Sequence, residues 1–435
     1  MTDRNSSPAD RLGTRRRRAS PGTGFWLVAY AFTIVMAFSA VPTPLYVVYA
    51  ARDHFSGLTV TLVYAVYAVG VIASLFLLGH LSDRFGRRRV LMPAVAVSVL
   101  AGLVFVLWTS LPALLIARVL SGVAVGMVTT TATAHLGELH ARRRPGQVAQ
   151  ATEATQPARP AQGARLPQLV AVAANLGGIG AGPLVAGMLA QFAPRPLLVP
   201  YVVMEALLLL GLVGLWRTPE TVTPPSVRTP YHPQRIVVPR EGRARFAAAC
   251  LAALVTFSAF GLFTSLAPSF LAHSLRDPSH ALAGGVVFAV FASAAITQAA
   301  LLSLRVRTTL LATMVLVPLG LAGVVAATWT GSLAAFVLGG AVTGAGAGLA
   351  FKGALAAAIE VAPPTARAEA LAGFFLSGYI GLSVPIVLLG IVGEHVSTRV
   401  EVALFGAVAA AAMVATAAAL LPRRPPATTD DVTGE

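Results

Sequence analysis

The stretch Gly79-His80-Leu81-Ser82-Asp83-Arg84-Phe85-Gly86-Arg87-Arg88-Arg89 is a short, strongly basic segment between two apolar runs. Residues 58–78 before it and 90–109 after it are each long enough to cross a bilayer as a helix. Its glycines permit a tight turn and close packing, and its arginines favour the cytoplasmic face of a membrane. The stretch therefore predicts two membrane helices joined by a short cytoplasmic turn that contains one acid, Asp83.

The composition places the whole chain in the membrane class. Hydrophobic residues make up 56% of it and charged residues 11%, roughly half the charged fraction of a soluble protein. The net charge of +15 does not indicate nucleic-acid binding, because the arginines are distributed among many loops and form no single basic face. The single cysteine, Cys250, excludes an internal disulfide and a cysteine metal site.

The sequence contains no phosphate loop, no zinc-ligand spacing and no nucleophile elbow. We therefore expect no enzymatic activity, no metal and no cofactor. Any transport of a substrate would be driven by an ion gradient.

Twelve apolar spans can be counted. They cover residues 25–50, 58–79, 90–109, 112–137, 168–191, 197–216, 246–271, 282–303, 309–328, 332–356, 369–392 and 401–421. The first span is too long for the apolar region of a signal peptide, so we expect it to be retained. An even number of spans places both termini on one side. That side carries 26 of the 32 lysine and arginine residues, against four on the other, which predicts that both termini are cytoplasmic.

The two halves of the chain resemble each other. Residues 117–126 in the fourth span and 335–344 in the tenth are identical at five of ten positions, and Pro183 in the fifth span corresponds to Pro385 in the eleventh. Parallel six-helix repeats are typical of secondary transporters. We expect a disordered basic cytoplasmic tail over 1–24, six-helix halves over 25–216 and 246–421, a cytoplasmic linker over 217–245 and a cytoplasmic tail over 422–435. The long segment 138–167 is interpreted as a tolerated insertion, with a regulatory role as the alternative.

The stretch at 79–89 reads G-x-L-S-D-R-x-G-R-R, which resembles the signature between helices 2 and 3 of the major facilitator superfamily. The resemblance implies an all-α integral membrane fold, with twelve transmembrane helices in two pseudo-symmetric six-helix bundles. In that family the acid matching Asp83 latches the two halves on the cytoplasmic side, near the start of helix 11. The alternative is a loop that only sets topology. The resemblance assigns gating to Gly79, Asp83, Arg84, Gly86, Arg87 and Arg88.

The fourth span carries Arg118-x-x-x-Gly122-x-x-x-Gly126, which resembles the family's helix 4 signature and implies a role for Arg118 in proton transfer. An arginine inside a span is costly and should face a cavity and a partner; snorkelling to the outer interface is the alternative. Glu205 is the only acid well inside a span. Burial there favours the neutral carboxyl group, so we predict that Glu205 carries the coupling proton and that Arg118 modulates it. The alternative is a neutral acid that bonds a neighbouring helix.

Residues 178–187 in the fifth span read G-x-x-x-G-P-x-x-A-G, which resembles the later part of the motif of proton-coupled exporters. Leu169 and Ala186 stand where that motif has glycine. Glycines four residues apart allow helices to pack closely, and proline bends a helix. We assign helix packing and bending to Gly122, Gly126, Gly178, Gly182, Pro183 and Gly187.

Tyr30, Tyr64 and Tyr67 either line a cavity, where they would contact a substrate, or lie in an interfacial aromatic belt. Lys352, near the cytoplasmic end of the tenth span, is expected to snorkel, with a substrate or coupling role as the alternative. Together the patterns favour a monomeric secondary transporter of the plasma membrane (the cell inner membrane), which exports lipophilic or amphipathic small molecules in exchange for protons. The alternatives are proton-coupled uptake of a metabolite, and a membrane receptor or scaffold that transports nothing.

Overall fold

The computed structural model describes residues 19–79, 81–143, 165–222, 242–274, 279–363 and 367–421. What we expect of the tails 1–18 and 422–435, of residues 144–164, and of the linker residues 223–241 lies outside this part of the chain. Within it the protein is helical, with turns between the helices and no strand. Twelve helices in the described residues are long and apolar enough to cross a membrane, at the positions expected from the sequence.

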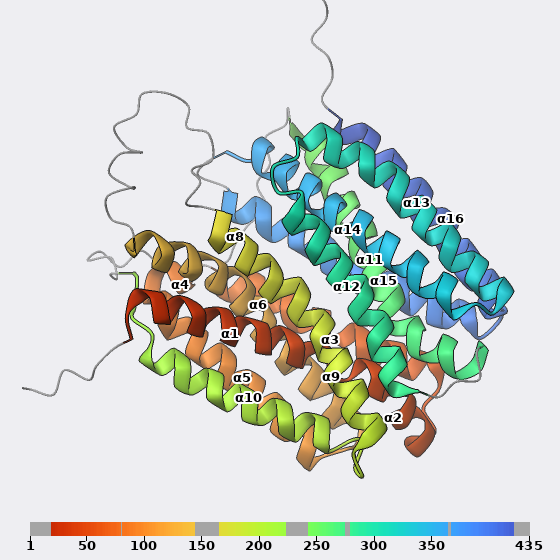
Figure 1. Cartoon of the computed structure of the whole chain (residues 1–435), viewed down its shortest axis with the longest axis horizontal. Helices are drawn as coiled ribbons and strands as arrows, with labels where there is room; N and C mark the ends of the chain where they lie inside the picture. The colour runs from red at the N-terminus through yellow and green to blue at the C-terminus, as the bar shows by residue number, and fades with distance from the viewer. Residues whose placement is uncertain are drawn as a thin grey trace, which may run out of the picture.

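The helices form two bundles that lie side by side (Figure 1). The first contains α1 (Pro21–Ala40), η1 (Thr43–Leu45), α2 (Tyr46–Asp53), α3 (Gly57–Leu78), α4 (Leu81–Phe85), α5 (Arg87–Leu107), α6 (Leu111–Arg142), α8 (Arg165–Val172), η3 (Ala173–Gly177), α9 (Gly178–Phe192) and α10 (Val199–Arg217). The second contains α11 (Arg243–Ser274), α12 (His280–Ala300), α13 (Val306–Thr330), α14 (Leu333–Val361), α15 (Arg367–Gly393) and α16 (Thr398–Leu420).

Capping and proline residues explain where the first span begins and breaks. The helix begins at Pro21 because the Ser20 hydroxyl accepts a hydrogen bond from the Thr23 N–H (3.1 Å) and proline is tolerated in the first turn. Residues 21–24, expected in the disordered tail, therefore belong to α1. The helix is interrupted at residues 41–45, where Pro42 and Pro44 lack the N–H groups that would continue it, and resumes as α2.

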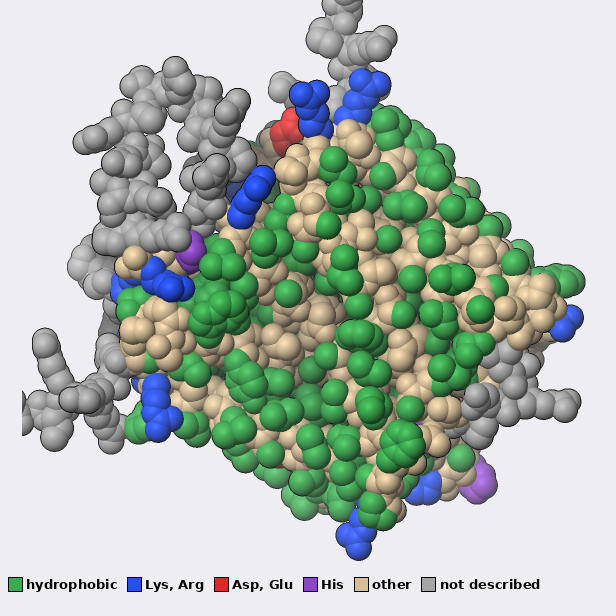
Figure 2. Space-filling view, viewed as in Figure 1, with side chains coloured by type: hydrophobic (Ala, Val, Ile, Leu, Met, Phe, Trp, Pro, Cys, Tyr) green, Lys and Arg blue, Asp and Glu red, His purple; other side chains and the backbone are tan. Residues whose placement is uncertain are grey.

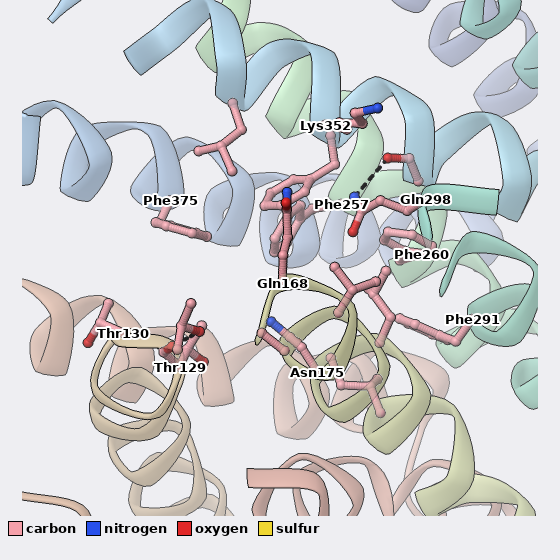
Figure 3. Close-up of a pocket in the computed structure, with 18 of the residues that line it drawn as sticks. Thr129, Thr130, Gln168, Asn175, Phe257, Phe260, Phe291, Gln298, Lys352 and Phe375 are labelled. Atoms are coloured by element: carbon pink, nitrogen blue, oxygen red, sulfur yellow. Dashed lines mark hydrogen bonds between the residues drawn. The ribbon is translucent and has the colours of Figure 1, made fainter. Parts of the chain in front are cut away.

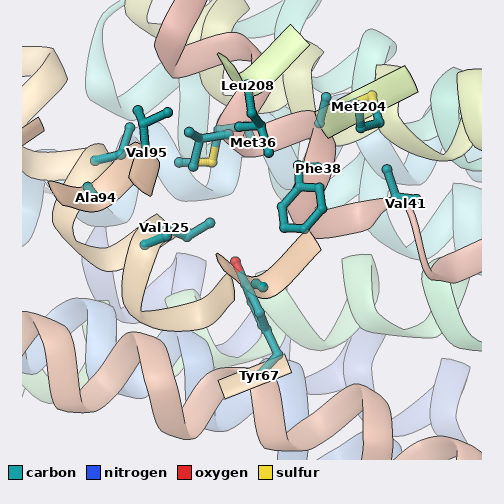
Figure 4. Close-up of a cluster of buried hydrophobic side chains, with 14 of the residues drawn as sticks. Met36, Phe38, Val41, Tyr67, Ala94, Val95, Val125, Met204 and Leu208 are labelled. Atoms are coloured by element: carbon teal, nitrogen blue, oxygen red, sulfur yellow. The ribbon is translucent and has the colours of Figure 1, made fainter. Parts of the chain in front are cut away.

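Each bundle has its own apolar core. In the first, Met36 and Phe38 of α1 pack with Val95 of α5, Val125 of α6 and Met204 of α10 (Figure 4).

In the second bundle, Phe336 of α14 stacks on Phe270 of α11, with ring centroids 4.4 Å apart. Phe336 is the repeat counterpart of Arg118. An aromatic ring thus occupies the position in the second half that a cation occupies in the first half.

The bundles contact each other along two seams, α9 against α12 and α3 against α15. Gly284 of α12 lies directly on the Pro183 carbonyl of α9, and Gly187 of α9 lies on the His280 carbonyl of α12. On the other seam the Ser383 hydroxyl donates to the Ala65 carbonyl (3.3 Å). The tightest of these contacts lie toward the end of the molecule opposite the arginine-rich loops, so the two halves are closed there.

The outer surface of the bundles is apolar. Figure 2 shows green side chains across most of one face, with the lysine and arginine side chains at its edges. Large exposed residues such as Leu210, Val315, Leu338 and Val408 project outward from four different helices. This distribution suits a protein surrounded by lipid.

Candidate substrate cavity

A cavity with a volume of about 1260 Å³ lies between the two halves. It extends from the middle of the molecule, at Ser39 and Tyr64, to the helix ends beside the arginine-rich loops, at Ala141 and Ile359. The closed seams lie at its deep end. Typical small-molecule sites have volumes of about 300–1,000 Å³, so this cavity is large enough to bind a small organic molecule.

The two halves line the cavity with different chemistry (Figure 3). The first half contributes hydroxyl and amide side chains: Thr129, Thr130, Thr133, Gln168 and Asn175. The second half contributes an aromatic wall: Phe257, Phe260, Phe291, Phe351, Phe375 and Tyr379. The rings of this wall support one another; those of Phe260 and Phe291, for example, stack at 4.6 Å. The cavity is therefore amphipathic.

Asn175 reaches the cavity from an irregular turn. Residues 173–177 form a π-helix between α8 and α9, and both Asn175 and Leu176 line the cavity. Single π-turns inside helices are rare and recur at functional sites. The sequence analysis did not single out Asn175 or the other hydroxyl and amide residues of the cavity lining. The signal was available, because amide and hydroxyl side chains inside apolar spans need hydrogen-bond partners or water.

Arg118 lies at the deep end of the cavity, with its side chain 3% exposed. Its guanidinium donates to three backbone carbonyls: those of Ser39 (2.7 Å), Val63 (3.3 Å) and Tyr64 (3.3 Å). Ser39 belongs to the last turn of α1, where a cation is stabilised by the helix dipole. Among the described residues no carboxylate forms an ion pair with Arg118. The side chain thus fastens α6 to α1 and α3 and does not extend toward the outer interface.

Lys352 lines the cavity nearer to its open end. Its ammonium group donates to the carbonyls of Leu301 (2.5 Å) and Leu302 (2.9 Å), the two residues that follow α12. A cation there complements the C-terminal end of the helix dipole. Lys352 therefore has a structural partner within the protein, in addition to any contact with a substrate.

The structure does not bring Glu205 to the cavity or to Arg118. Its carboxylate lies between α10 and α5, directly on Gly102 and near the ring of Phe38. Both carboxylate oxygens are buried, and no group in the described part of the chain forms a hydrogen bond with them. Glu205 is thus an acid whose carboxylate is buried between helices of the first bundle.

The three tyrosines have different surroundings. Tyr64 and Tyr67 line the cavity, and the Tyr64 hydroxyl accepts a hydrogen bond from Thr264 of the second half (2.8 Å). The Tyr67 ring centroid lies 4.6 Å from the Arg118 guanidinium carbon. Tyr30 lies away from the cavity wall, and its hydroxyl donates to the Leu207 carbonyl of α10 (3.1 Å).

The basic turn before α5 is held by Glu220, an acid that sequence reasoning missed. Its carboxylate accepts hydrogen bonds from the backbone N–H groups of Arg87 (2.8 Å) and Arg88 (3.2 Å), which are otherwise unpaired donors at the start of the helix. Gly86 adopts φ +108° directly beside this carboxylate. The available signal was an acid directly after a span, on the same side as the basic turn.

The profile of the Major Facilitator Superfamily matches residues 27–306 and 248–435, which together span most of the chain. The chain belongs to the major facilitator superfamily. Solved structures with a similar fold include a crystal structure of a point mutant of the nucleoside transporter NupG, with a TM-score of 0.65 and 13% sequence identity, covering 92% of this chain and 98% of that one. The expected fold, two bundles of six transmembrane helices, is confirmed.

Two curated relatives match parts of this superfamily protein. A triacylglyceride transporter of Mycobacteroides abscessus is 31% identical over 149 residues, covering 34% of this chain and 29% of the relative. An arabinose-proton symporter of Bacillus subtilis is 32% identical over 90 residues, covering 21% and 18%. The chain thus matches less than a third of the length of either relative. These relatives support a transporter of this superfamily and do not place it in the drug-exporter branch.

In this superfamily member the acid of the basic turn is paired within its own half. Asp83 forms an ion pair with Arg87 (2.5 Å) and its side chain is 67% exposed. Arg87 also binds Glu138 of α6 (3.0 Å). Arg84 lies over the Phe85 ring at 5.9 Å, and Gly79 ends α3 in a right-handed conformation.

The glycines assigned to packing all lie at helix contacts. Gly122 and Gly126 of α6 touch α3 at the Tyr67 carbonyl and at Ser74. Gly178 and Gly182 of α9 touch the backbone of α1, while Gly187 touches α12. Helix α9 is therefore packed between the two halves of the transporter, with Pro183 at the contact.

Proposed function

We propose that this transporter exports lipophilic or amphipathic small molecules in exchange for protons, by alternating access of the cavity. The observation that carries the proposal is the amphipathic cavity between the halves, whose lining combines an aromatic wall with hydroxyl and amide groups. Such a lining suits a molecule with a large apolar part and a few polar groups.

The open end of the cavity supports an inward-facing state. The cavity reaches the side that carries most of the arginines, which the positive-inside rule assigns to the cytoplasm. We infer that the protein lies in the plasma membrane with both termini cytoplasmic and that this structure is its inward-facing state. A substrate would then enter from the cytoplasm and leave when the seams between α9 and α12 and between α3 and α15 open.

Glu205 is the proposed proton carrier. A buried carboxylate without hydrogen-bond partners is destabilised when charged, so its charge state is sensitive to access of water. Because Glu205 lies between α5 and α10 and not in the cavity, its protonation would act on substrate binding through helix packing. The support is its isolation in the core of the first bundle.

Proton-coupled uptake of a metabolite is the second candidate. The match to an arabinose-proton symporter favours it, as do the amide side chains of Gln168 and Asn175, which could bind sugar hydroxyls. Export of a lipophilic molecule is favoured over uptake because six aromatic rings line the second-half side of the cavity, beside Thr264, Gln298 and Lys352, and because another relative is a triacylglyceride transporter.

The proposal is tested by the accumulation of fluorescent lipophilic compounds in cells with and without the protein. Export predicts lower accumulation in expressing cells, and a protonophore should abolish the difference. Higher accumulation in expressing cells would support uptake instead. Equal accumulation across a broad panel, together with unchanged metabolite profiles, would support the receptor or scaffold alternative.

A further inference from the structure

The described lining of the cavity contains cationic side chains without acidic ones. Among the described residues that line it, the charged side chains are Arg118 and Lys352, and none is aspartate or glutamate. Two acids at the arginine-rich end of the helices are paired with arginines outside the cavity lining: Glu138 with Arg87 and Glu360 with Arg245. The described cavity wall is therefore electropositive.

The two cations differ in their availability to a ligand. Arg118 is 3% exposed and satisfied by three carbonyls. The ammonium group of Lys352 donates to two carbonyls and has a third N–H. Carbonyl groups are neutral dipoles, so they leave the positive charge of Lys352 uncompensated. In the described part of the chain no carboxylate lies within ion-pair distance of it.

Lys352 lies beside the aromatic wall. It follows Phe351, whose ring centroid is 5.9 Å from that of Phe257 and 6.1 Å from that of Phe375. Figure 3 shows Phe257, Phe375 and Lys352 on the side of the cavity opposite Thr129 and Thr130. A ligand that places a flat apolar body on these rings would bring a terminal charged group within reach of the ammonium.

We propose that the cavity selects amphipathic organic anions, which place a negative group beside Lys352 and an aromatic or other flat body against the phenylalanine wall. This inference rests on the proposed function in that the cavity is taken to be the substrate site. An organic cation meets two like charges there and no carboxylate among the described lining residues, and charge complementarity is a strong source of discrimination.

The test uses three probes with one ring system, two with a permanent charge and one neutral: 1-naphthalenesulfonate, trimethyl(1-naphthylmethyl)ammonium and 1-naphthalenesulfonamide. Binding to the purified full-length protein is measured by equilibrium dialysis. We expect the sulfonate to bind about tenfold or more tightly than the ammonium probe, with the sulfonamide between them. Lys352→Gln should remove most of this preference, whereas Lys352→Arg should retain it. Sulfonamide binding should change less than about twofold in both variants, which shows that the cavity is intact.

Equal or tighter binding of the ammonium probe would overturn the inference, as would an unchanged preference in Lys352→Gln or no binding of any probe. Transport experiments with the same probes distinguish a failure of this inference from a failure of the proposed export function. If the sulfonate binds selectively but no pH gradient moves it in vesicles, export is overturned and the charge selectivity stands. If an acidic lumen drives accumulation of the ammonium probe and not of the sulfonate, export stands and the charge selectivity is overturned.

Discussion

The carboxylate of Glu220, just beyond α10, accepts a hydrogen bond of 2.8 Å from the backbone N–H of Arg87, at the start of α5. A second oxygen accepts from the N–H of Arg88, and the Arg142 side chain donates to the Glu220 carbonyl (3.1 Å). One acid thus ties the basic turn to the ends of α6 and α10. The first half can therefore move as a unit when the cavity opens and closes.

We expect Glu220→Ala to destabilise the protein by about 1 kcal/mol, the usual effect of losing a side-chain cap at a helix start. Glu360→Ala is the control, because that acid forms an exposed ion pair with Arg245 and exposed pairs contribute little. Thermal unfolding in detergent measures both. Equal melting temperatures for the two variants would contradict the capping role.

Asp83→Asn should slow transport several-fold while leaving the melting temperature nearly unchanged. The side chain is largely exposed in this arrangement, so its loss has little effect on stability here. If it docks at the start of α15 when the cavity closes on this side, the variant loses a contact only in that other state. Initial rates in reconstituted vesicles test this. Initial rates equal to those of the wild type would indicate that the basic turn only sets the membrane topology.

Gly284→Ala should impair transport, whereas Gly285→Ala should not. A Cβ at Gly284 would collide with the Pro183 carbonyl across the α9–α12 seam, while a Cβ at the neighbouring Gly285 meets nothing within 4 Å. The first variant should hold the seam open and expose cavity residues to a membrane-impermeant thiol reagent added outside. A cysteine introduced at Thr129 reports this exposure. Identical labelling in the two variants would count against a seam that closes the cavity.

Arg118→Met should lower stability by about 1–2 kcal/mol, since the Ser39 carbonyl at the end of α1 loses its charged donor. Arg118→Lys keeps the charge and should lose less. If Arg118 has a purely structural role, the transport rate should fall only in proportion to the amount of folded protein. A role in coupling predicts a shifted pH dependence of the initial rate in Arg118→Lys, measured at equal amounts of folded protein.

Glu205→Gln should uncouple transport from protons. The amide has nearly the same shape, so exchange of labelled for unlabelled substrate should persist, while accumulation driven by a pH gradient should be lost. Glu394→Gln, at an exposed acid, should retain both. If Glu205→Gln accumulates substrate like the wild type, Glu205 is not the proton carrier.

The fold could be predicted because membrane insertion leaves few choices. Apolar runs of about 20 residues must be helical, and the alternating distribution of arginines predicts which helix ends face the cytoplasm. Helix ends were harder to predict. Helix α1 begins before its apolar run because of the Ser20 cap, and α6 and α14 extend beyond their apolar runs to Arg142 and Val361.

The site was harder to predict than the fold. Arg118 stands out as a charge in a span, but its carbonyl partners on α1 and α3 come from tertiary packing. Glu205 stands out equally, yet it faces Gly102 and not the cavity, because helical periodicity in an all-apolar helix does not show which face is inward. The partners of Glu220 likewise depend on α10 ending beside the basic turn.

The most direct test of proton-coupled export measures accumulation of a permanently charged substrate in vesicles under opposite pH gradients. The membrane potential is clamped with valinomycin and potassium, and protein-free vesicles serve as the control. Exchange of substrate for protons predicts accumulation only when the lumen is more acidic than the medium, whatever the orientation of the inserted protein. Accumulation only in vesicles with an alkaline lumen would contradict the account and identify a symporter.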